Sequence, residues 1–265
     1  MPKIGLWHML GNCTALGALA ASGCDFVGLD AQHGVMGVTE LATCLQVLAA
    51  RGVSSIVRVM SAEDPLYSHA LDFGAGAVLV PMLRGGGDVE DAVLRSRLQP
   101  SGTRSVVGEA FNGPGSRHWC SGAKSDGTAI WGMLETREAV DKLEEIVAVE
   151  GLGGLFIGPS DLALAYGLSP GSVEAKGLID SIGGTLVGLA RAAGLATGIF
   201  VRESGDVPRA VAAGFGYVVV GSDLGCLERW AALEVSASRA NNSKGVMATV
   251  REQGGDGRAN GQEGG

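Results

Sequence analysis

Short apolar runs alternate with helix-like stretches along most of this 265-residue chain, and this alternation restricts the fold more than any other feature. The runs have strand length and are almost continuously apolar, as expected for parallel strands that are covered on both faces. We expect eight strands, at Ile4–Trp7, Phe26–Leu29, Ser54–Val59, Ala77–Val80, Ala129–Leu134, Leu155–Pro159, Ala196–Phe200 and Tyr217–Val220.

The stretches between these strands contain residues that are typical of helix ends. Asp64-Pro65 places an N-cap residue before a proline at the first helical position, and Gly74 follows at the C-terminal end. Eight strands alternating with helices predict a (β/α)8 TIM barrel, a single domain over residues 1–240. A doubly wound open sheet is the alternative, but the first turn lacks GxGxxG. From Asn241 the chain is rich in Gly, Asn, Gln and charge, so we expect a disordered tail over residues 241–265.

Composition excludes several classes of partner. The formal charge of −8 and pI near 5.0 argue against nucleic acid binding. No apolar run reaches the roughly 18 residues of a membrane span. The N-terminus lacks the pattern of a signal peptide, and the five cysteines form no CxxC pair. We therefore expect a cytoplasmic protein with free thiols and no membrane partner.

Two neighbouring strands each end in a carboxylate. Glu135 follows Ala129–Leu134, and Asp161 comes just past the apolar run that ends at Pro159. Carboxylates this close at the rim of a parallel sheet repel each other unless a cation or a proton lies between them. Mg²⁺ or Mn²⁺ suits such a pair, with open positions for water and substrate. Alternatively, each could simply be a helix N-terminal carboxylate favoured by the helix dipole.

His33 and Arg58 are further candidates at strand ends. An imidazole titrates near neutral pH and suits a general base, so His33 is the stronger candidate and His8 the weaker. His33 could instead be held by a backbone carbonyl. The guanidinium of Arg58 matches a substrate carboxylate, or else pairs with Asp30 or Asp72 within the protein.

The lysine positions exclude one type of chemistry. None of the five lysines falls at the carboxyl end of a predicted strand, where imine or pyridoxal phosphate chemistry would need one. A carbanion in this barrel would therefore be stabilised by a metal. Gly198 and Val220-Gly221-Ser222 lie where many barrels bind phosphate, although close packing explains such glycines better.

Several segments resemble one known family in unbroken order across residues 3–235. They are Ile4-Gly5-Leu6-Trp7, Asp30-Ala31-Gln32-His33, Val57-Arg58-Val59, Leu71-Asp72-Phe73-Gly74-Ala75, Val78-Leu79-Val80-Pro81-Met82, Leu134-Glu135-Thr136 and Phe156–Leu162. The chain is similar to the HpcH/HpaI aldolases. The resemblance implies a class II pyruvate aldolase, a carbon–carbon lyase that uses Mg²⁺, Mn²⁺ or Co²⁺. It also implies 2-oxoacid and aldehyde substrates, and a homo-oligomer (hexamer or trimer) that exchanges the last helix.

The resemblance also assigns roles to individual residues. It implies that Glu135 and Asp161 are the metal ligands and that Arg58 binds the 2-oxoacid and polarises its keto oxygen. His33 would be the base, with its ring held by Asp72. The backbone of the segment after the sixth strand would receive the substrate carboxylate, at Gly158, Pro159 and Ser160.

Three departures from the family pattern affect these expectations. Gln32 stands where the family usually has Glu, and Met133 stands where it usually has Gln. The segment Gln99–Asp126 is too long for an ordinary connection, so we expect it to pack over a functional face. Its part from Arg104 to Asp126 is also unlike its relatives', and we expect that part to shape the aldehyde pocket. The alternative function keeps the site but decarboxylates oxaloacetate or traps the enolate otherwise, as macrophomate synthase and a citrate synthase of the family do. A scaffold protein without catalysis fits less well, because all four candidate side chains are present.

Overall fold

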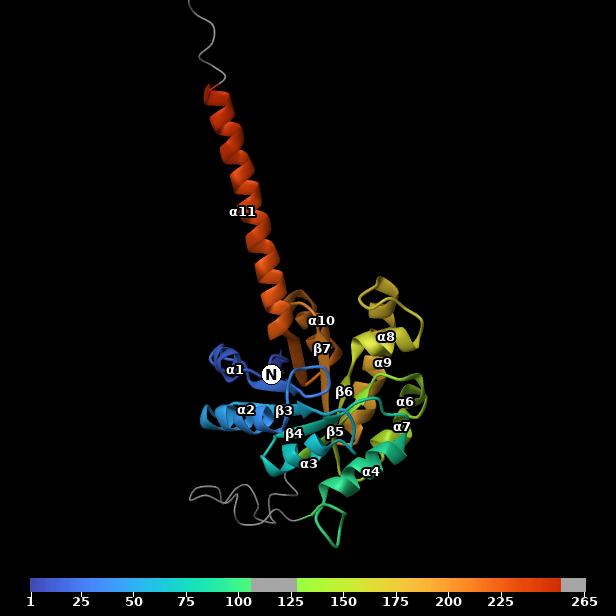
Figure 1. The fold of residues 1–265 in the computed structure, drawn as a ribbon. Helices are drawn as coiled ribbons and strands as arrows, with labels where there is room; N and C mark the ends of the chain where they lie inside the picture. The colour runs from blue at the N-terminus through green and yellow to red at the C-terminus, as the bar shows by residue number, and fades with distance from the viewer. Residues whose placement is uncertain (106–127, 254–265) are drawn as a thin grey trace, which may run out of the picture. The chain divides into compact units, whose positions relative to one another are not determined.

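Eight parallel strands close into a barrel in this protein (Figure 1). The computed structural model describes residues 1–105 and 128–253, with side chains to residue 239. Each strand pairs with the next along the chain, and the eighth pairs with the first. The strands are β1 Lys3–His8, β2 Phe26–Asp30, β3 Ser54–Arg58, β4 Ala77–Val80, β5 Ala129–Leu134, β6 Leu152–Ile157, β7 Ala196–Val201 and β8 Tyr217–Ser222. The predicted (β/α)8 barrel is confirmed.

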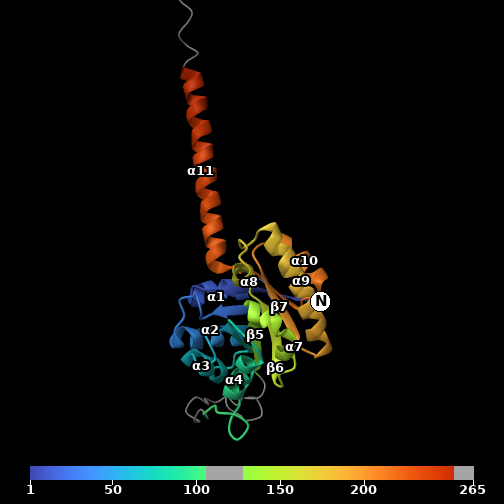
Figure 2. The ribbon, with the colours of Figure 1, turned by 90° about the vertical axis from the view of Figure 1, so that its right-hand side faces the viewer.

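Helices follow the strands and surround the barrel. In Figure 2, α1 to α4 (blue to green) lie on one side of the barrel and α9 and α10 (yellow to orange) on the other. Their bounds are α1 Cys13–Ala20, α2 Val38–Ala50, α3 Pro65–Asp72, α4 Gly86–Ser96, α6 Arg137–Asp141, α7 Leu143–Val147, α8 Pro159–Ala165, α9 Val173–Ala192 and α10 Val207–Ala213, with a short 3-10 helix at Ser204–Asp206. The buried helix faces pack on the outer side of the strands and form the larger part of the core.

Local sequence explains most of these boundaries. The Asp64 side chain accepts the N–H of Leu66 at 2.9 Å, which confirms the predicted cap of α3. The apolar spacing of Thr136–Glu150 predicts one continuous helix. The structure corrects this, because the backbone leaves helical geometry at Lys142, which separates α6 from α7. Glu145, in α7, accepts the N–H of Gly86 at 2.7 Å and so fixes this second helix against the start of α4.

Large aromatic rings fill the interior of the barrel, and each lies against a glycine on a neighbouring strand. A Cβ atom at any of these glycines would come within 2.2–2.7 Å of a ring atom. The pairs are Trp7 with Gly28, Phe26 with Gly5, Trp131 with Gly154 and Phe156 with Gly198. Close packing therefore accounts for Gly198, as one of the two interpretations of this residue predicted.

We expect Gly198→Ala to lower the free energy of unfolding by about 1–3 kcal/mol, because the added methyl group would overlap the ring of Phe156. Gly188→Ala is the matched control, since Gly188 lies in α9 with no atom within 4 Å of the added Cβ. Alanine there is expected to be neutral or stabilising. Urea denaturation of both variants tests this, and equal stability of the two would contradict it.

Residues Leu224–Gly265 form a second unit, separate from Met1–Asp223. Helix α11 runs from Asp223 to Gln253 and so includes residues 241–253 of the predicted tail. The segment after Asn241 contains no proline and many residues that tolerate a helix, and the first glycine pair of the tail, Gly254-Gly255, comes only after Gln253. The remaining residues of that predicted tail lie outside the described part of the chain.

Three further predictions concern membrane-spanning helices, the cysteines and the long segment before β5. Across the described residues, no helix combines the length and apolar character that crossing a membrane requires. Four of the cysteines lie in the described part of the chain, and all four are free thiols. Most of the segment that was expected to pack over the functional face, residues 106–127, lies outside the described part.

Candidate functional site

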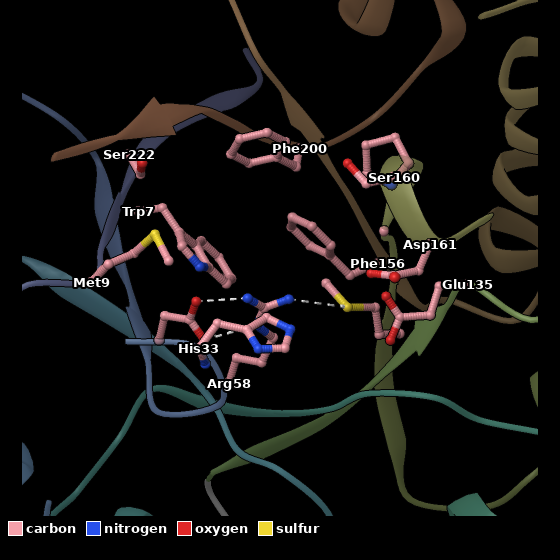
Figure 3. A pocket seen from close by; sticks show the side chains of 14 residues that line it. Trp7, Met9, His33, Arg58, Glu135, Phe156, Ser160, Asp161, Phe200 and Ser222 are labelled. Carbon is pink, nitrogen blue, oxygen red and sulfur yellow. Dashed lines mark hydrogen bonds and ion pairs between the residues drawn. The ribbon is translucent and has the colours of Figure 1, made fainter. Parts of the chain in front are cut away.

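A cavity of about 210 Å³ lies at the carboxyl ends of the strands. Seven of the eight strands contribute a side chain to its wall. Figure 3 shows these side chains converging on one space. Every predicted site residue but one lines the cavity, namely His33, Arg58, Glu135, Gly158, Pro159, Ser160 and Asp161. The exception is Asp72.

Glu135 and Asp161 lie together on one side of this cavity. Glu135 directly follows β5, and Asp161 is in the first turn of α8, directly after β6. Since β5 and β6 are parallel neighbours, their carboxyl ends meet at the same rim. Figure 3 shows the two carboxylates turned toward each other. The structure therefore brings together the pair that the sequence predicted.

The backbone around Glu135 fixes its side chain. Its Oε1 atom accepts the N–H of Met82 at 2.8 Å. Met82 has a φ of 56°, a left-handed conformation that a residue with a side chain seldom adopts. On the other side, a Cβ atom at Gly158 would lie 2.2 Å from Oε2 of Glu135. Gly158 thus provides the space that the carboxylate occupies.

The electrostatics of this pair favour a cation. Glu135 is 2 % exposed, and burial raises its pKa to about 7, with the nearby charge of Asp161 acting in the same direction. The hydrogen bond from Met82 and the charge of Arg58 partly oppose this rise. A divalent cation between the carboxylates would neutralise both. Within the described residues no group of three His, Cys, Asp or Glu could hold a metal, so water or substrate would complete the coordination.

Arg58 and Asp30 form a bidentate ion pair in the wall of the cavity. Nη2 of Arg58 lies 2.6 Å from Oδ2 of Asp30, and Nε lies 3.0 Å from Oδ1. Asp30 is fully buried, and burial would raise its pKa. The ion pair with Arg58 and the N–H of His33 outweigh burial and lower the pKa of Asp30 below its ordinary value. Of the two pairings that the sequence left open, the structure has the one with Asp30.

The ion pair with Asp30 uses Nε and Nη2 of Arg58, so Nη1 remains available to a ligand. Nη1 is 4.0 Å from the sulfur of Met133, and the guanidinium lies 5.3 Å from the centroid of the Trp7 ring. Met133 cannot supply the hydrogen bonds that the usual Gln would. The cavity therefore has a softer, more apolar wall next to Arg58 than the family pattern predicts.

His33 lies in the turn after β2, with its ring at the cavity. Its backbone N–H donates to Oδ1 of Asp30 at 3.2 Å, and its ring makes no hydrogen bond within the described part of the chain. Figure 3 shows the ring beside the Arg58 side chain. Asp30 rather than Asp72 is therefore the carboxylate that positions this turn.

The predicted pairing of Asp72 with His33 is not present. Asp72 is the last residue of α3 and forms an ion pair with Arg104. A helix of a (β/α)8 barrel starts near the carboxyl ends of the strands and returns the chain to their amino ends. The end of α3 is therefore at the face opposite the cavity, out of reach of His33.

Sequence reasoning missed four wall residues, namely Trp7, Met9, Phe156 and Phe200. Ser222, also in the wall, belongs to the segment Val220-Gly221-Ser222 that the sequence pointed to. Trp7 and Phe200 lie near the carboxyl ends of β1 and β7. Strand periodicity could have placed some of these side chains inside the barrel, since alternate residues point inward. Which of them reaches the cavity depends on strand tilt, which the sequence does not reveal.

His8, the weaker candidate base, lies outside the cavity. It is fully buried, and its Nδ1 atom is 2.7 Å from Oδ2 of Asp223. The other oxygen of Asp223 accepts the N–H of Met9 at 2.9 Å. On its far side, Nε2 of His8 lies 3.9 Å from the thiol of Cys44. His8 therefore links the end of β1 to Asp223, the residue directly after β8.

Gln32 also lies outside the cavity wall. Its backbone N–H donates to Oδ1 of Asp30 at 3.1 Å. Its side-chain Oε1 atom is buried and accepts no hydrogen bond within the described residues. The exchange of the usual Glu for Gln32 thus removes a charge behind the turn that carries His33 and changes no residue of the wall.

Known proteins resemble this chain in sequence and in fold. The HpcH/HpaI aldolase/citrate lyase family model matches residues 3–229. A 4-hydroxy-2-oxo-heptane-1,7-dioate aldolase of Salmonella arizonae is 32% identical over 250 residues, which cover 92% of each chain. A crystal structure of a HpcH/HpaI aldolase/citrate lyase family protein from Burkholderia cenocepacia has a TM-score of 0.80 at 28% identity, with 90% of this chain and 95% of that one covered. Macrophomate synthase shares the fold, with a TM-score of 0.80 at 23% identity over 92% of this chain and 86% of its own.

Proposed function

The chain belongs to the HpcH/HpaI aldolase/citrate lyase family, and we propose that it is a divalent-metal-dependent aldolase that cleaves or forms 4-hydroxy-2-oxoacids. One observation carries this proposal. Two carboxylates lie side by side across one cavity from a guanidinium and an imidazole. That arrangement suits a reaction in which a 2-oxoacid passes through its enolate.

Glu135 and Asp161 would hold the cation. The buried Glu135 carboxylate, with a pKa near 7 and a second carboxylate next to it, fits such an ion well. Two carboxylates with open positions for water and substrate suit Mg²⁺, Mn²⁺ or Co²⁺. When bound, the cation supplies Lewis acidity that stabilises negative charge on the keto oxygen of the substrate.

Arg58 supplies positive charge on the opposite side of the cavity. Asp30 holds two of its nitrogens, so the guanidinium is already oriented before substrate arrives. Its Nη1 atom points toward Met133 and the carboxylate pair (Figure 3). In this position Arg58 would donate to the keto oxygen and stabilise the enolate as it forms.

His33 would move the protons, directly or through a water molecule. In the cleavage direction it accepts the proton of the 4-hydroxyl group, and the bond between C3 and C4 breaks to release an aldehyde. The electron pair of that bond remains with pyruvate as its enolate. The protonated His33 then returns the proton to C3, which restores a neutral imidazole and gives pyruvate.

Ser160 would bind the substrate carboxylate. The backbone of Gly158, Pro159 and Ser160 was predicted to bind this carboxylate. Gly158 already donates its N–H to the carbonyl of Leu134 at 3.4 Å, and Pro159 has no N–H. Ser160 therefore offers the available backbone donor of the three, together with its hydroxyl. We further propose that the enzyme works in the cytoplasm as a homo-oligomer.

Product analysis separates this proposal from the alternative in the same family. We expect purified protein with Mn²⁺ to release pyruvate from 4-hydroxy-2-oxoacids in a reaction that yields one aldehyde per pyruvate. Oxaloacetate is the competing substrate, and its decarboxylation yields pyruvate and CO₂ with no aldehyde. A much higher kcat/KM for oxaloacetate than for any 4-hydroxy-2-oxoacid would overturn the aldolase assignment in favour of the decarboxylase.

His33→Ala is expected to lower the exchange of the pyruvate methyl protons by about 10²–10⁴-fold, because the group that transfers the proton is removed. Mn²⁺ binding should stay unchanged, since the carboxylates remain. His69→Ala is the control: this histidine stacks on Phe73 away from the cavity. Isotope incorporation measured by mass spectrometry, with Mn²⁺ binding by calorimetry, checks both expectations. Unchanged exchange in His33→Ala would remove this residue from the mechanism.

A further inference from the structure

Two cysteines lie next to each other outside the reaction cavity. Cys13 begins α1, just after the loop that follows β1, and Cys44 lies in the middle of α2. The two helices pack side by side (Figures 1 and 2), and the two thiols are hydrogen-bonded to each other. Cys44 is fully buried, whereas Cys13 is half-buried. A small oxidant can therefore reach the sulfur of Cys13 before that of Cys44.

A buried histidine stands against the thiol of Cys44. Nε2 of His8 lies 3.9 Å from Sγ of Cys44, and Nδ1 of His8 lies 2.7 Å from Oδ2 of Asp223. A carboxylate in this position favours the tautomer with its proton on Nδ1, so the lone pair of Nε2 faces the thiol. His8 has no part in the proposed aldol chemistry, but it is placed to accept the proton of Cys44.

Cys44 needs such a base because its own acidity is low. Burial, the charge of Cys13 and the hydrogen bond with the Cys13 thiol raise the pKa of Cys44 to about 12. Cys44 is therefore a neutral thiol at neutral pH, and its sulfur becomes a nucleophile only when the proton is taken from it. Cys24 is half-buried like Cys13, but its thiol donates to the carbonyl of Leu19 at 3.4 Å instead of meeting a second thiol.

From this arrangement we propose that Cys13 and Cys44 form a redox modification site, at which hydrogen peroxide produces a reversible disulfide. The deprotonated sulfur of Cys13 attacks one peroxide oxygen, the O–O bond breaks, and the departing hydroxide takes up the proton that Cys13 released. Cys13 is oxidised to a sulfenic acid, and peroxide is reduced. The sulfur of Cys44 then attacks that of Cys13 and the S–O bond breaks. The proton of Cys44 passes through Nε2 of His8 to the departing hydroxide, so the two thiols and one peroxide yield one disulfide and two water molecules. Exchange with a reduced dithiol restores both thiols.

The disulfide would act on the reaction cavity through the loops after β1 and β2. Val35 donates its N–H to the carbonyl of Met9 at 2.8 Å, which joins the two loops. Met9 and His33, which these loops carry, both line the cavity. Bond formation brings the sulfur atoms of Cys13 and Cys44 to about 2.0 Å and draws the start of α1 toward α2. We expect oxidation to slow proton transfer by His33, an expectation that rests on the proposed function.

Peptide mapping of the full-length protein tests the disulfide directly. The protein is treated with a small excess of hydrogen peroxide, the remaining thiols are alkylated in denaturant, and the peptides are analysed by mass spectrometry without reduction. We expect a linked pair of peptides that contain Cys13 and Cys44, lighter by two hydrogens than the separate peptides and lost on treatment with dithiothreitol. Cys24 should remain alkylated. Alkylation of both Cys13 and Cys44 after peroxide, or irreversible oxidation of Cys13 alone, would overturn the proposal.

Variants separate the two chemical steps. Cys44→Ser should stop at the sulfenic acid of Cys13, which dimedone traps as a stable adduct. His8→Gln should form the disulfide about 10²-fold more slowly, because no base takes the proton of Cys44. Dimedone should still trap Cys13 at the unmodified rate in His8→Gln, which shows that the fold around it is retained. Cys24→Ser is the matched control and should form the disulfide normally. Disulfide formation at the unmodified rate in His8→Gln would overturn the role of His8.

Proton exchange measures the effect on the cavity. Oxidised protein is expected to exchange the pyruvate methyl protons about tenfold more slowly than reduced protein, because a small displacement of the base is costly. Dithiothreitol should restore the rate, and Cys44→Ser should keep its rate after the same treatment. Equal exchange by reduced and disulfide-linked protein would overturn the link to the cavity. Absence of exchange in the reduced protein with Mn²⁺ would instead overturn the proposed function and not the disulfide.

Discussion

Glu135→Gln is expected to lower metal-dependent exchange of the pyruvate methyl protons by at least about 10³-fold, because the amide cannot ligate the cation as a carboxylate does. Mn²⁺ binding should fall in parallel. Glu138→Gln is the matched control, since this glutamate lies in the first turn of α6 at the same rim and lines a different cavity. Mn²⁺ affinity equal to that of the unmodified protein in Glu135→Gln would refute the ligand assignment.

The same substitution should stabilise the metal-free protein. The folded state raises the pKa of Glu135 from 4.5 to about 7, so it holds a proton that the unfolded chain releases between these values. Stability is therefore lost as pH rises through this window, and above pH 7 the buried charge costs up to about 3 kcal/mol. With chelator at pH 8, Glu135→Gln should melt at a higher temperature than the unmodified protein. At pH 4 the difference should disappear, and Mn²⁺ should reverse the order at pH 8.

Arg58→Ala is expected to lower the free energy of unfolding by about 3–5 kcal/mol, because it leaves the fully buried carboxylate of Asp30 without a counter-ion. Proton exchange should also fall by about 10²–10³-fold, because the guanidinium no longer stabilises the enolate. Chemical denaturation and isotope incorporation measure the two effects separately.

A second substitution separates the structural role of Arg58 from its catalytic role. Adding Asp30→Asn to Arg58→Ala removes the unpaired charge and should restore much of the stability. Activity should remain as low as in the single variant, because no guanidinium donates to the keto oxygen. Recovery of activity together with stability would show that Arg58 acts only through the fold.

The architecture could be predicted because parallel strands that are covered on both faces appear in the sequence as continuous apolar runs. Ala77–Val80 and Ala129–Leu134 were placed within the bounds that the structure shows. Helix ends were harder to predict, since the break at Lys142 has no strong signal in the sequence. The glycine-rich composition has a physical reason as well, because Gly28 and Gly198 make space for the rings of Trp7 and Phe156.

The site was predictable where strand order alone decides position. Glu135 and Asp161 follow adjacent strands, so their meeting at one rim follows from the fold. The error at Asp72 came from resemblance, although the topology already places the end of α3 at the opposite face. The role of Met82 was beyond sequence reasoning, because its contact with Glu135 is made by a backbone N–H in a left-handed conformation.

Metal dependence of pyruvate enolisation tests the central claim most directly. The unmodified protein is incubated with pyruvate in deuterated water, first with Mn²⁺ and then with excess chelator, and deuterium in the methyl group is followed by mass spectrometry. We predict rapid incorporation with Mn²⁺, none above the background rate after chelation, and full recovery when Mn²⁺ is restored. Incorporation that continues undiminished with chelator would contradict a cation held by Glu135 and Asp161 as the stabiliser of the enolate.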